Sequence, residues 1–139
     1  MGVVIDTCVF VAAERRGLNF GELLIQVRRI LPGERFVGSS ITAAELIQGV
    51  YQADAAYARK REVFVRTVVE ALEIVPFTKE TAWIAGRIRG TLAAAGGMLP
   101  VADSLIAATA LELGYGIVTN NVKDFIRIPD LHVTPFTLS

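Results

Sequence analysis

The chain has 139 residues, 53% of them hydrophobic, and its 14 basic and 14 acidic residues give a net charge of zero. This length fits one domain, residues 1–139, and the balanced charge argues against a protein that coats nucleic acid, though not against a local basic rim. The single cysteine excludes a cysteine zinc cluster, and the single histidine excludes a HExxH site. The sequence has no apolar run long enough to span a membrane and no signal sequence, so we expect a cytoplasmic location.

The first half of the chain predicts two strands, each followed by two helices. Val3-Val4-Ile5 is a short β-branched run that is typical of a buried strand. Helices are expected over residues 9–16 and 20–31, and the second ends at Pro32-Gly33. Residues 35–37 form the next predicted strand, and helices follow over about 42–51 and 53–72.

The second half continues the alternation of strands and helices. A strand is predicted over 73–75, then a helix over about 79–95, which Thr78 can cap. Pro100 opens a helix that runs to about residue 113. Strands over 117–119 and 131–133 complete the pattern, with a turn between them. Regular alternation of this kind predicts an α/β fold whose parallel strands are joined by right-handed helical crossovers.

Several acidic residues lie where the predicted strands end. In open α/β sheets, ligands bind outside the carboxyl ends of the strands. Asp6 follows the first strand and Glu45 lies in the helix after the second. Asp103 lies in the helix before the fourth strand, and Asp124 follows that strand. We therefore expect these carboxylates to converge at one edge of the sheet.

Each of these acids also has a simpler structural explanation. Asp6 can cap a helix, and Thr42 with Glu45 has the spacing of a capping box. Asp103 suits the first turn of a helix, and Asp124 suits a turn. Taken together, however, converging carboxylates repel one another, and a cation relieves that repulsion. Oxygen ligands without Cys or His select Mg²⁺ or Mn²⁺, which can activate a water for hydrolysis.

Four segments resemble the motifs of PIN-domain ribonucleases, in the family's order and across nearly the whole chain. The third and fourth in tandem are fairly specific, and the full set is strong evidence. The segments are Val3-Val4-Ile5-Asp6-Thr7-Cys8-Val9-Phe10, Ser40-Ile41-Thr42-Ala43-Ala44-Glu45-Leu46 with Gly49, Pro100-Val101-Ala102-Asp103-Ser104-Leu105-Ile106-Ala107-Ala108-Thr109-Ala110, and Thr119-Asn120-Asn121-Val122-Lys123-Asp124-Phe125.

The resemblance implies a three-layer α/β/α sandwich with a five-stranded parallel sheet, and RNA cut by metal-activated water. Asp6, Glu45 and Asp103 fall on the family's three acidic positions, and of these Asp6 and Asp103 are expected to bind the metal ion. The fourth position falls either to Asn121 or to Asp124, which lies one turn further on. Thr7 and Thr119 are expected to orient the ligands through their hydroxyl groups.

The chain's size resembles the free-standing VapC-like toxins of toxin–antitoxin pairs. That resemblance implies a small antitoxin from the same operon, which covers the acidic site, and a tendency to form homodimers. The mean hydropathy of +0.48 is compatible with apolar surface covered by such partners. A housekeeping RNA-processing nuclease and a non-catalytic RNA- or protein-binding module are the alternatives. A phosphoacceptor signalling domain is disfavoured, because no acid pair follows the first strand and no Asp follows the third.

Basic residues near the acids are candidates for holding RNA. Lys123 and Arg127 flank the fourth motif and are the best candidates for contacting phosphate. The other basic candidates are more simply explained as solvated helix faces. Trp83 and Tyr51 have the side chains to stack on bases, and Cys8 is expected to be a small buried hydrophobic residue. The remaining basic candidates are Arg15, Arg16, Lys79, Arg87 and Arg89.

Overall fold

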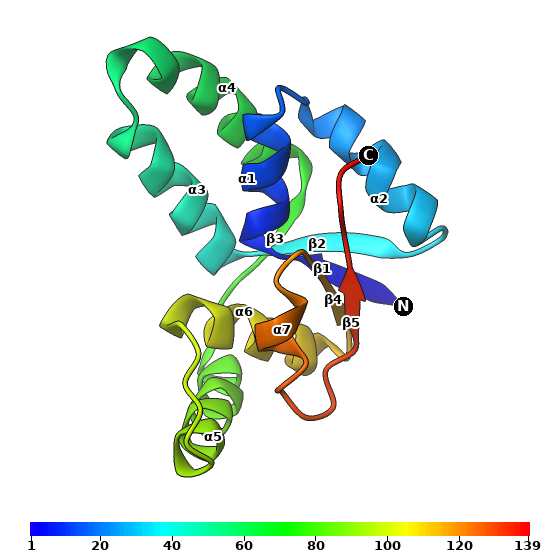
Figure 1. The fold of residues 1–139 in the computed structure, drawn as a ribbon, viewed down its shortest axis with the longest axis vertical. Helices are drawn as coiled ribbons and strands as arrows, with labels where there is room; N and C mark the ends of the chain where they lie inside the picture. Colours follow the sequence, from blue (N-terminus) through cyan, green and yellow to red (C-terminus); the bar gives the residue numbers. More distant parts are fainter.

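The computed structural model describes residues 1–139 and contains one five-stranded sheet in the order β3-β2-β1-β4-β5 (Figure 1). All four neighbouring pairs of strands are parallel. The strands are β1 (Gly2–Ile5), β2 (Arg35–Ser39), β3 (Glu73–Val75), β4 (Gly116–Thr119) and β5 (Val133–Pro135). The predicted five-stranded parallel sheet is therefore confirmed.

Helices cover both faces of this sheet, which makes three layers (Figure 1). Side chains alternate along β1, so that Val3 and Ile5 join one core while Val4 joins the other. The first core includes side chains of α1 (Thr7–Arg15), α2 (Phe20–Ile30), α3 (Ser40–Gln52) and α4 (Ala55–Ala71). The second includes those of α5 (Lys79–Ala94), α6 (Val101–Leu113) and the short α7 (Val122–Phe125). No helix has the length and apolar character that crossing a membrane requires.

Several element boundaries differ from the sequence prediction. Helix α1 begins two residues earlier than expected, because the Asp6 side chain caps it by accepting a hydrogen bond from the Thr7 amide. Residues 122–125, expected as turn, form α7. Strand β5 begins at Val133, where the run 131–133 was predicted to end. Leu131 instead packs into the second core, and pairing with β4 starts from Val133 opposite Ile117.

The strand order places a crevice at the carboxyl ends of β1 and β4. From β1 the chain moves outward to β2 and β3, and then crosses back to place β4 on the other side of β1. The helices that follow neighbouring strands thus leave in different directions at this point, and ligands of open α/β sheets bind in such a crevice. Asp6 directly follows β1, and Thr119 ends β4.

Candidate functional site

Asp6 is buried at the head of the crevice, with 3% of its surface exposed, and three donors hold its carboxylate. Oδ1 accepts a hydrogen bond from the Thr7 amide at 2.8 Å. Oδ2 accepts from the hydroxyl of Thr119 at 2.7 Å and from the thiol of Cys8 at 3.0 Å. A carboxylate offers about four acceptor positions, so one position on Oδ1 remains for a ligand. Asp6 is therefore a helix cap whose carboxylate is held in one orientation by three donors.

Cys8 packs partly buried against the first core, which agrees in part with the expectation, and its thiol also makes polar contacts. Its thiol donates to Asp6 and lies 3.4 Å from the Thr119 hydroxyl. Burial, and then the negative charge of Asp6, raise the pKa of the Cys8 thiol to about 12. A thiol with this pKa stays neutral at pH 7, so Cys8 acts as a hydrogen-bond donor and not as a nucleophile.

Glu45 contacts α1 instead of capping its own helix. Helix α3 begins at Ser40, and Ser39 caps it by accepting from the Ile41 amide, so the capping box of Thr42 and Glu45 is wrong. Glu45 lies in the second turn, and its Oε1 accepts a hydrogen bond of 2.7 Å from the Thr7 hydroxyl. The Glu45 carboxylate is thereby fixed beside the start of α1.

A chain of hydroxyl groups supports that carboxylate. The Thr7 oxygen lies 2.8 Å from the hydroxyl of Thr42, which is 1% exposed. Thr7 has one hydroxyl proton and gives it to Glu45, so Thr42 must donate to Thr7. Thr42 is a positioning residue that the sequence interpretation missed. The consecutive cap-forming residues Ser39 and Ser40 were the available signal that the helix starts earlier.

Replacing Thr42 with valine, which keeps the shape and removes the donor, is expected to lower RNA cleavage by about five-fold. One buried hydrogen bond contributes about 1 kcal/mol, and a loss of that size in the transition state corresponds to such a factor. Thr42→Ser restores the hydroxyl and should return cleavage to near the wild-type rate. Steady-state cleavage of one RNA by the three proteins measures this, and equal rates for Thr42→Val and wild type would contradict it.

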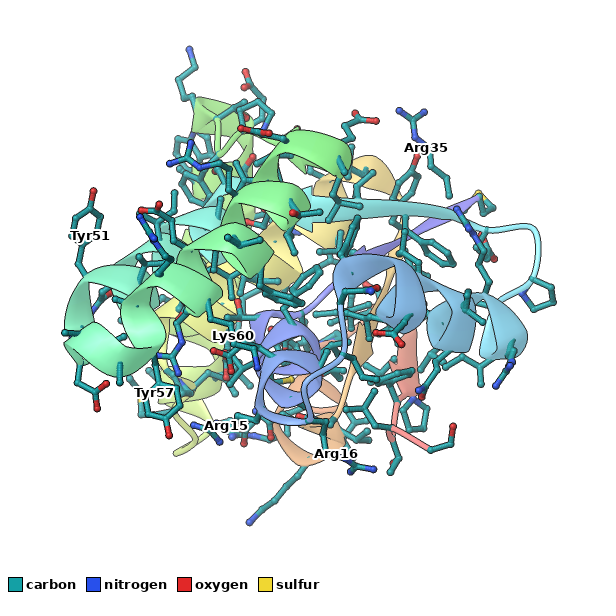
Figure 2. The ribbon with its side chains drawn as sticks, turned by 90° about the horizontal axis from the view of Figure 1, so that it is seen from above. Arg15, Arg16, Arg35, Tyr51, Tyr57 and Lys60 are labelled. Atoms are coloured by element: carbon teal, nitrogen blue, oxygen red, sulfur yellow. The ribbon has the colours of Figure 1, made fainter.

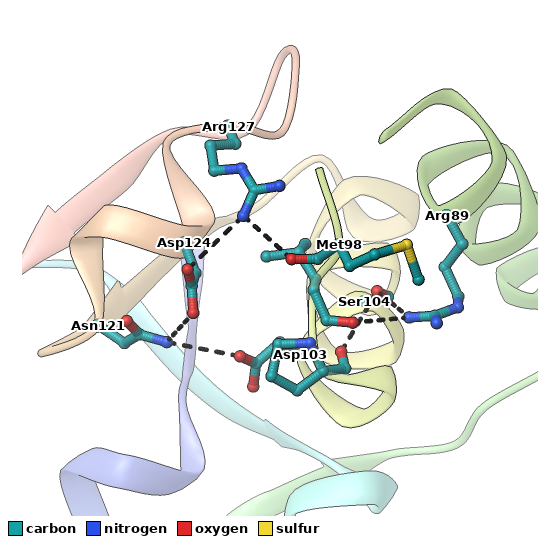
Figure 3. A network of polar contacts seen from close by, with 9 residues as sticks. Arg89, Met98, Asp103, Ser104, Asn121, Asp124 and Arg127 are labelled. Atoms are coloured by element: carbon teal, nitrogen blue, oxygen red, sulfur yellow. Dashed lines mark hydrogen bonds and ion pairs between the residues drawn. The ribbon is translucent and has the colours of Figure 1, made fainter. Parts of the chain in front are cut away.

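Asp103, Asn121 and Asp124 form a second group of polar side chains, in which Asn121 lies between the two acids (Figure 3). The Asn121 side-chain amide donates to Asp124 Oδ2 at 3.0 Å and makes a long contact of 3.5 Å to Asp103 Oδ2. Its backbone amide donates to the Thr119 hydroxyl, which in turn donates to Asp6. Asn121 thus bridges two carboxylates as a neutral donor, and the two candidates for the fourth position, Asn121 and Asp124, are hydrogen-bonded to each other.

Repulsion among the acids affects the pKa of Asp103. The pKa of its carboxyl is raised to about 6, first by burial and then by the negative charges of Asp6, Asp124 and Glu45. The four carboxylates, predicted separately from four motifs, therefore interact in the folded protein. A bound cation would lower this repulsion, which is the physical case for a metal at this position.

The donor set fits a hard divalent ion that keeps part of its water shell. No three acidic, cysteine or histidine side chains stand close enough together to enclose an ion by themselves. Mg²⁺ typically takes one or two carboxylates and retains several waters, so a complete protein cage is not required. The free position on Asp6 Oδ1 and the half-buried carboxylate of Asp103 suit that mode of binding.

The basic candidates have different environments. Lys123 is exposed and makes no ion pair, whereas Arg127 is paired with Asp124 at 3.7 Å and donates to the Met98 carbonyl at 3.1 Å (Figure 3). Arg89 donates to the Leu99 carbonyl and to Ser104, so it ties α5 to the start of α6. That contact gives Arg89 a structural role. Of the aromatic candidates, Trp83 and Tyr51 are both highly exposed.

Comparison with known proteins gives matches over almost the whole chain. A family model described as PIN domain matches residues 3–131. "Ribonuclease VapC1" of Rickettsia felis is 34% identical over 134 residues, covering 96% of this chain and 95% of the relative. The "tRNA(fMet)-specific endonuclease VapC" of Salmonella typhimurium is also 34% identical, over 110 residues, covering 78% of this chain and 81% of the relative.

Solved structures give the same result. VapBC2 from Rickettsia felis, bound to a DNA fragment from its promoter, contains a chain that superposes with a TM-score of 0.86 at 26% identity. The match covers 99% of this chain and 100% of that chain. The DNA-bound VapBC of Salmonella typhimurium matches with a TM-score of 0.83 at 28% identity, over 97% and 98% of the two chains.

Proposed function

Because this chain belongs to the PIN-domain family, we propose that residues 1–139 form a single PIN-like domain that acts as a VapC-type endoribonuclease, the toxin of a toxin–antitoxin pair. The observation that supports this most strongly is the convergence of four carboxylates beside the carboxyl ends of the strands. Thr7 bonds both Asp6 and Glu45, and Asn121 contacts both Asp103 and Asp124. The raised pKa of Asp103 agrees with this arrangement. The similarity to relatives named as VapC ribonucleases supports the same reaction.

In this proposal the acids have separate roles around the phosphate that is cut. Asp6 and Asp103 would hold Mg²⁺ or Mn²⁺, which would supply Lewis-acid chemistry and activate water for hydrolysis. Thr7 bonds one oxygen of the Glu45 carboxylate, and the second oxygen is left to accept a proton from the attacking water. Asp124 completes the site, with Thr7, Thr119 and Asn121 orienting the carboxylates. Lys123 and Arg127 contact the phosphates of the RNA, and Arg127 exchanges its pairing with Asp124 for that contact.

The proposal includes three further properties. A cognate antitoxin covers the acidic site, as the VapBC complexes among the structural neighbours suggest. Two copies of the chain form a homodimer, and the protein works in the cytoplasm, where its RNA substrate is.

Size-exclusion chromatography with light scattering tests the dimer, and a monomeric mass at micromolar concentration would contradict it.

Removal of divalent metal tests the ribonuclease. Cleavage of RNA by the purified chain should stop in excess EDTA, because the oxygen donors hold hard ions by weak, exchangeable bonds. Cleavage should return when Mg²⁺ or Mn²⁺ is added beyond the chelator, and Asp6→Ala should stay inactive under the same conditions as the matched control. Activity that persists in excess EDTA would refute the metal site. Absence of cleavage with every ion would favour a non-catalytic module.

A further inference from the structure

Two neighbouring hollows form a groove along α1, and one of them reaches Glu45. Its wider part, of about 510 Å³, lies between the end of α1, the start of α2 and α4, and its lining includes Arg15, Tyr57 and Lys60. A smaller hollow of about 190 Å³ shares Glu14, Arg15, Arg61 and Phe64 with it and extends to Glu45. Glu45 is bonded to Thr7 beside Asp6, so the two neighbouring hollows lie in a row along α1 between Glu45 and Tyr57.

The wider part of the groove carries an excess of positive charge in a chain whose net charge is zero. Arg15, Lys60 and Arg61 line it, against a single acid, Glu14. Glu14 is already paired with Arg61 at 2.6 Å, whereas Arg15 and Lys60 are exposed and make no ion pair in the structure. Figure 2 shows both cations on the same side of the molecule as Arg16 and Tyr57, with Arg35 on the opposite side. This local excess favours a polyanion as the ligand.

Tyr57 adds a surface for a base. It lies in the first turn of α4, and 62% of its surface is exposed. The aromatic residues Phe20 and Phe64 of the same lining are buried in the core. What the groove offers a ligand is therefore the Tyr57 ring, the exposed side chain of Val63 and the cationic side chains. An exposed aromatic ring beside cations is the usual arrangement for binding single-stranded nucleic acid.

We propose that this groove binds the RNA strand next to the scissile phosphate, with Tyr57 stacked on a base and Arg15 and Lys60 on phosphates. Helix α1 has nine residues and so spans about 13 Å, the length of no more than about four stacked nucleotides. The base on Tyr57 thus lies a few nucleotides from the cut. This inference rests on the proposed ribonuclease function and adds the site that selects single-stranded substrate.

Kinetics with two lengths of RNA test the groove. Tyr57→Ala should raise KM for a single-stranded RNA of about 16 nucleotides by roughly ten-fold, the scale of one lost base stack, and leave kcat unchanged. Tyr57→Phe should behave like wild type. Two shorter RNAs, each trimmed to two nucleotides on one side of the cut, test where the strand binds. One of them lacks the base that stacks on Tyr57, so wild type and Tyr57→Ala should cleave that RNA with equal efficiency. Lys60→Glu should raise KM and lower the salt slope of binding by about one.

The control variant is Arg29→Glu. Arg29 is exposed in the last turn of α2, which leads to the start of β2 and hence to the edge of the sheet opposite the site. This charge reversal should leave KM unchanged. If Tyr57→Ala and Lys60→Glu leave KM for the long RNA unchanged, or raise it equally for every trimmed RNA, the groove does not bind the strand. The proposal is also overturned if these variants lose only the binding of the small protein encoded next to this chain.

Binding measured without cleavage separates this proposal from the proposed function. Fluorescence anisotropy of labelled RNA with Asp103→Asn should show the same roughly ten-fold weakening when Tyr57→Ala is added. That result supports the groove even if the wild-type chain cuts no RNA. Equal affinity with and without Tyr57→Ala overturns the groove even if the wild-type chain cuts RNA normally.

Discussion

Cells that express this chain alone are expected to stop growing, whereas cells that express Asp6→Ala at the same level should grow normally. The physical reason is the position of Asp6, whose carboxylate is held by three donors and presents one remaining acceptor position to the ion. Without that carboxylate the ion cannot be placed, and RNA needed for translation is not cut. Growth curves after induction, with protein levels checked by immunoblot, measure the difference.

Two controls make this result specific. Asp6→Ala leaves the Thr119 hydroxyl and the Cys8 thiol without their acceptor, so Asp103→Asn serves as a second inactive form with fewer lost bonds. Co-expression of the neighbouring small protein should restore growth to cells that express the wild type. Equal harm from wild type and both variants would mean aggregation or binding, and not RNA cleavage, causes the arrest. Harmless wild-type expression together with RNA cleavage by the purified protein would indicate a housekeeping ribonuclease.

The second large effect concerns Asp103→Asn, which keeps the shape of the side chain and removes its charge. RNA cleavage should fall by at least about a hundred-fold, the scale of losing one electrostatic catalytic group. Single-turnover cleavage at saturating Mg²⁺ measures this loss without the contribution of substrate binding. Cleavage within a factor of a few of wild type would mean that Asp103 only serves the first turn of α6.

The same substitution should make the metal-free protein more stable, with a definite dependence on pH. The folded-state pKa of Asp103 is raised to about 6, so the folded protein holds this proton more tightly than the unfolded chain does. The contribution of Asp103 to the free energy of unfolding is fully present below its ordinary pKa of 3.8. This contribution is lost as the pH rises through the folded-state pKa of about 6. Above that pH the charged wild type should be less stable than Asp103→Asn.

Thermal unfolding in EDTA at pH 4 and pH 7.5 tests this dependence. Because Asp103 is only half-buried, solvent screens the repulsion, and a difference of no more than about 1 kcal/mol is expected at pH 7.5. At pH 4 the two proteins should unfold at nearly equal temperatures. Saturating Mg²⁺ at pH 7.5 should reduce or reverse the difference. A variant that is less stable than wild type in EDTA at pH 7.5 would contradict the repulsion.

The sequence predicted the parts of the molecule that depend on local patterns. Buried β-branched runs located the strands to within a few residues, and their alternation with helices predicted the parallel sheet. The rule that ligands bind at the carboxyl ends of parallel strands placed Asp6, Glu45 and Asp103 together before any contact was known. The raised pKa of Asp103, caused in part by the other two, agrees with that placement.

The parts that were missed depend on contacts between distant segments. Ser39, Ser40 and Thr42 are all able to cap a helix, so local preference alone does not decide where α3 begins. Thr42 is the partner of Thr7 only because α3 packs beside α1, 35 residues away. The groove behind Tyr57 likewise exists only once α4 lies against α1 and α2. No periodicity in the sequence carries information of this kind.

The bond between Thr119 and Asp6 also has a consequence for the time at which activity appears during synthesis. The two residues are 113 positions apart, and β1 has β4 as its partner on that side of the sheet. A ribosome therefore completes β1, β2 and β3 before the donor that orients Asp6 has been made. Closing so long a loop is a late and slow event in folding. The arrangement that orients Asp6 is therefore complete only after β4 has been inserted beside β1.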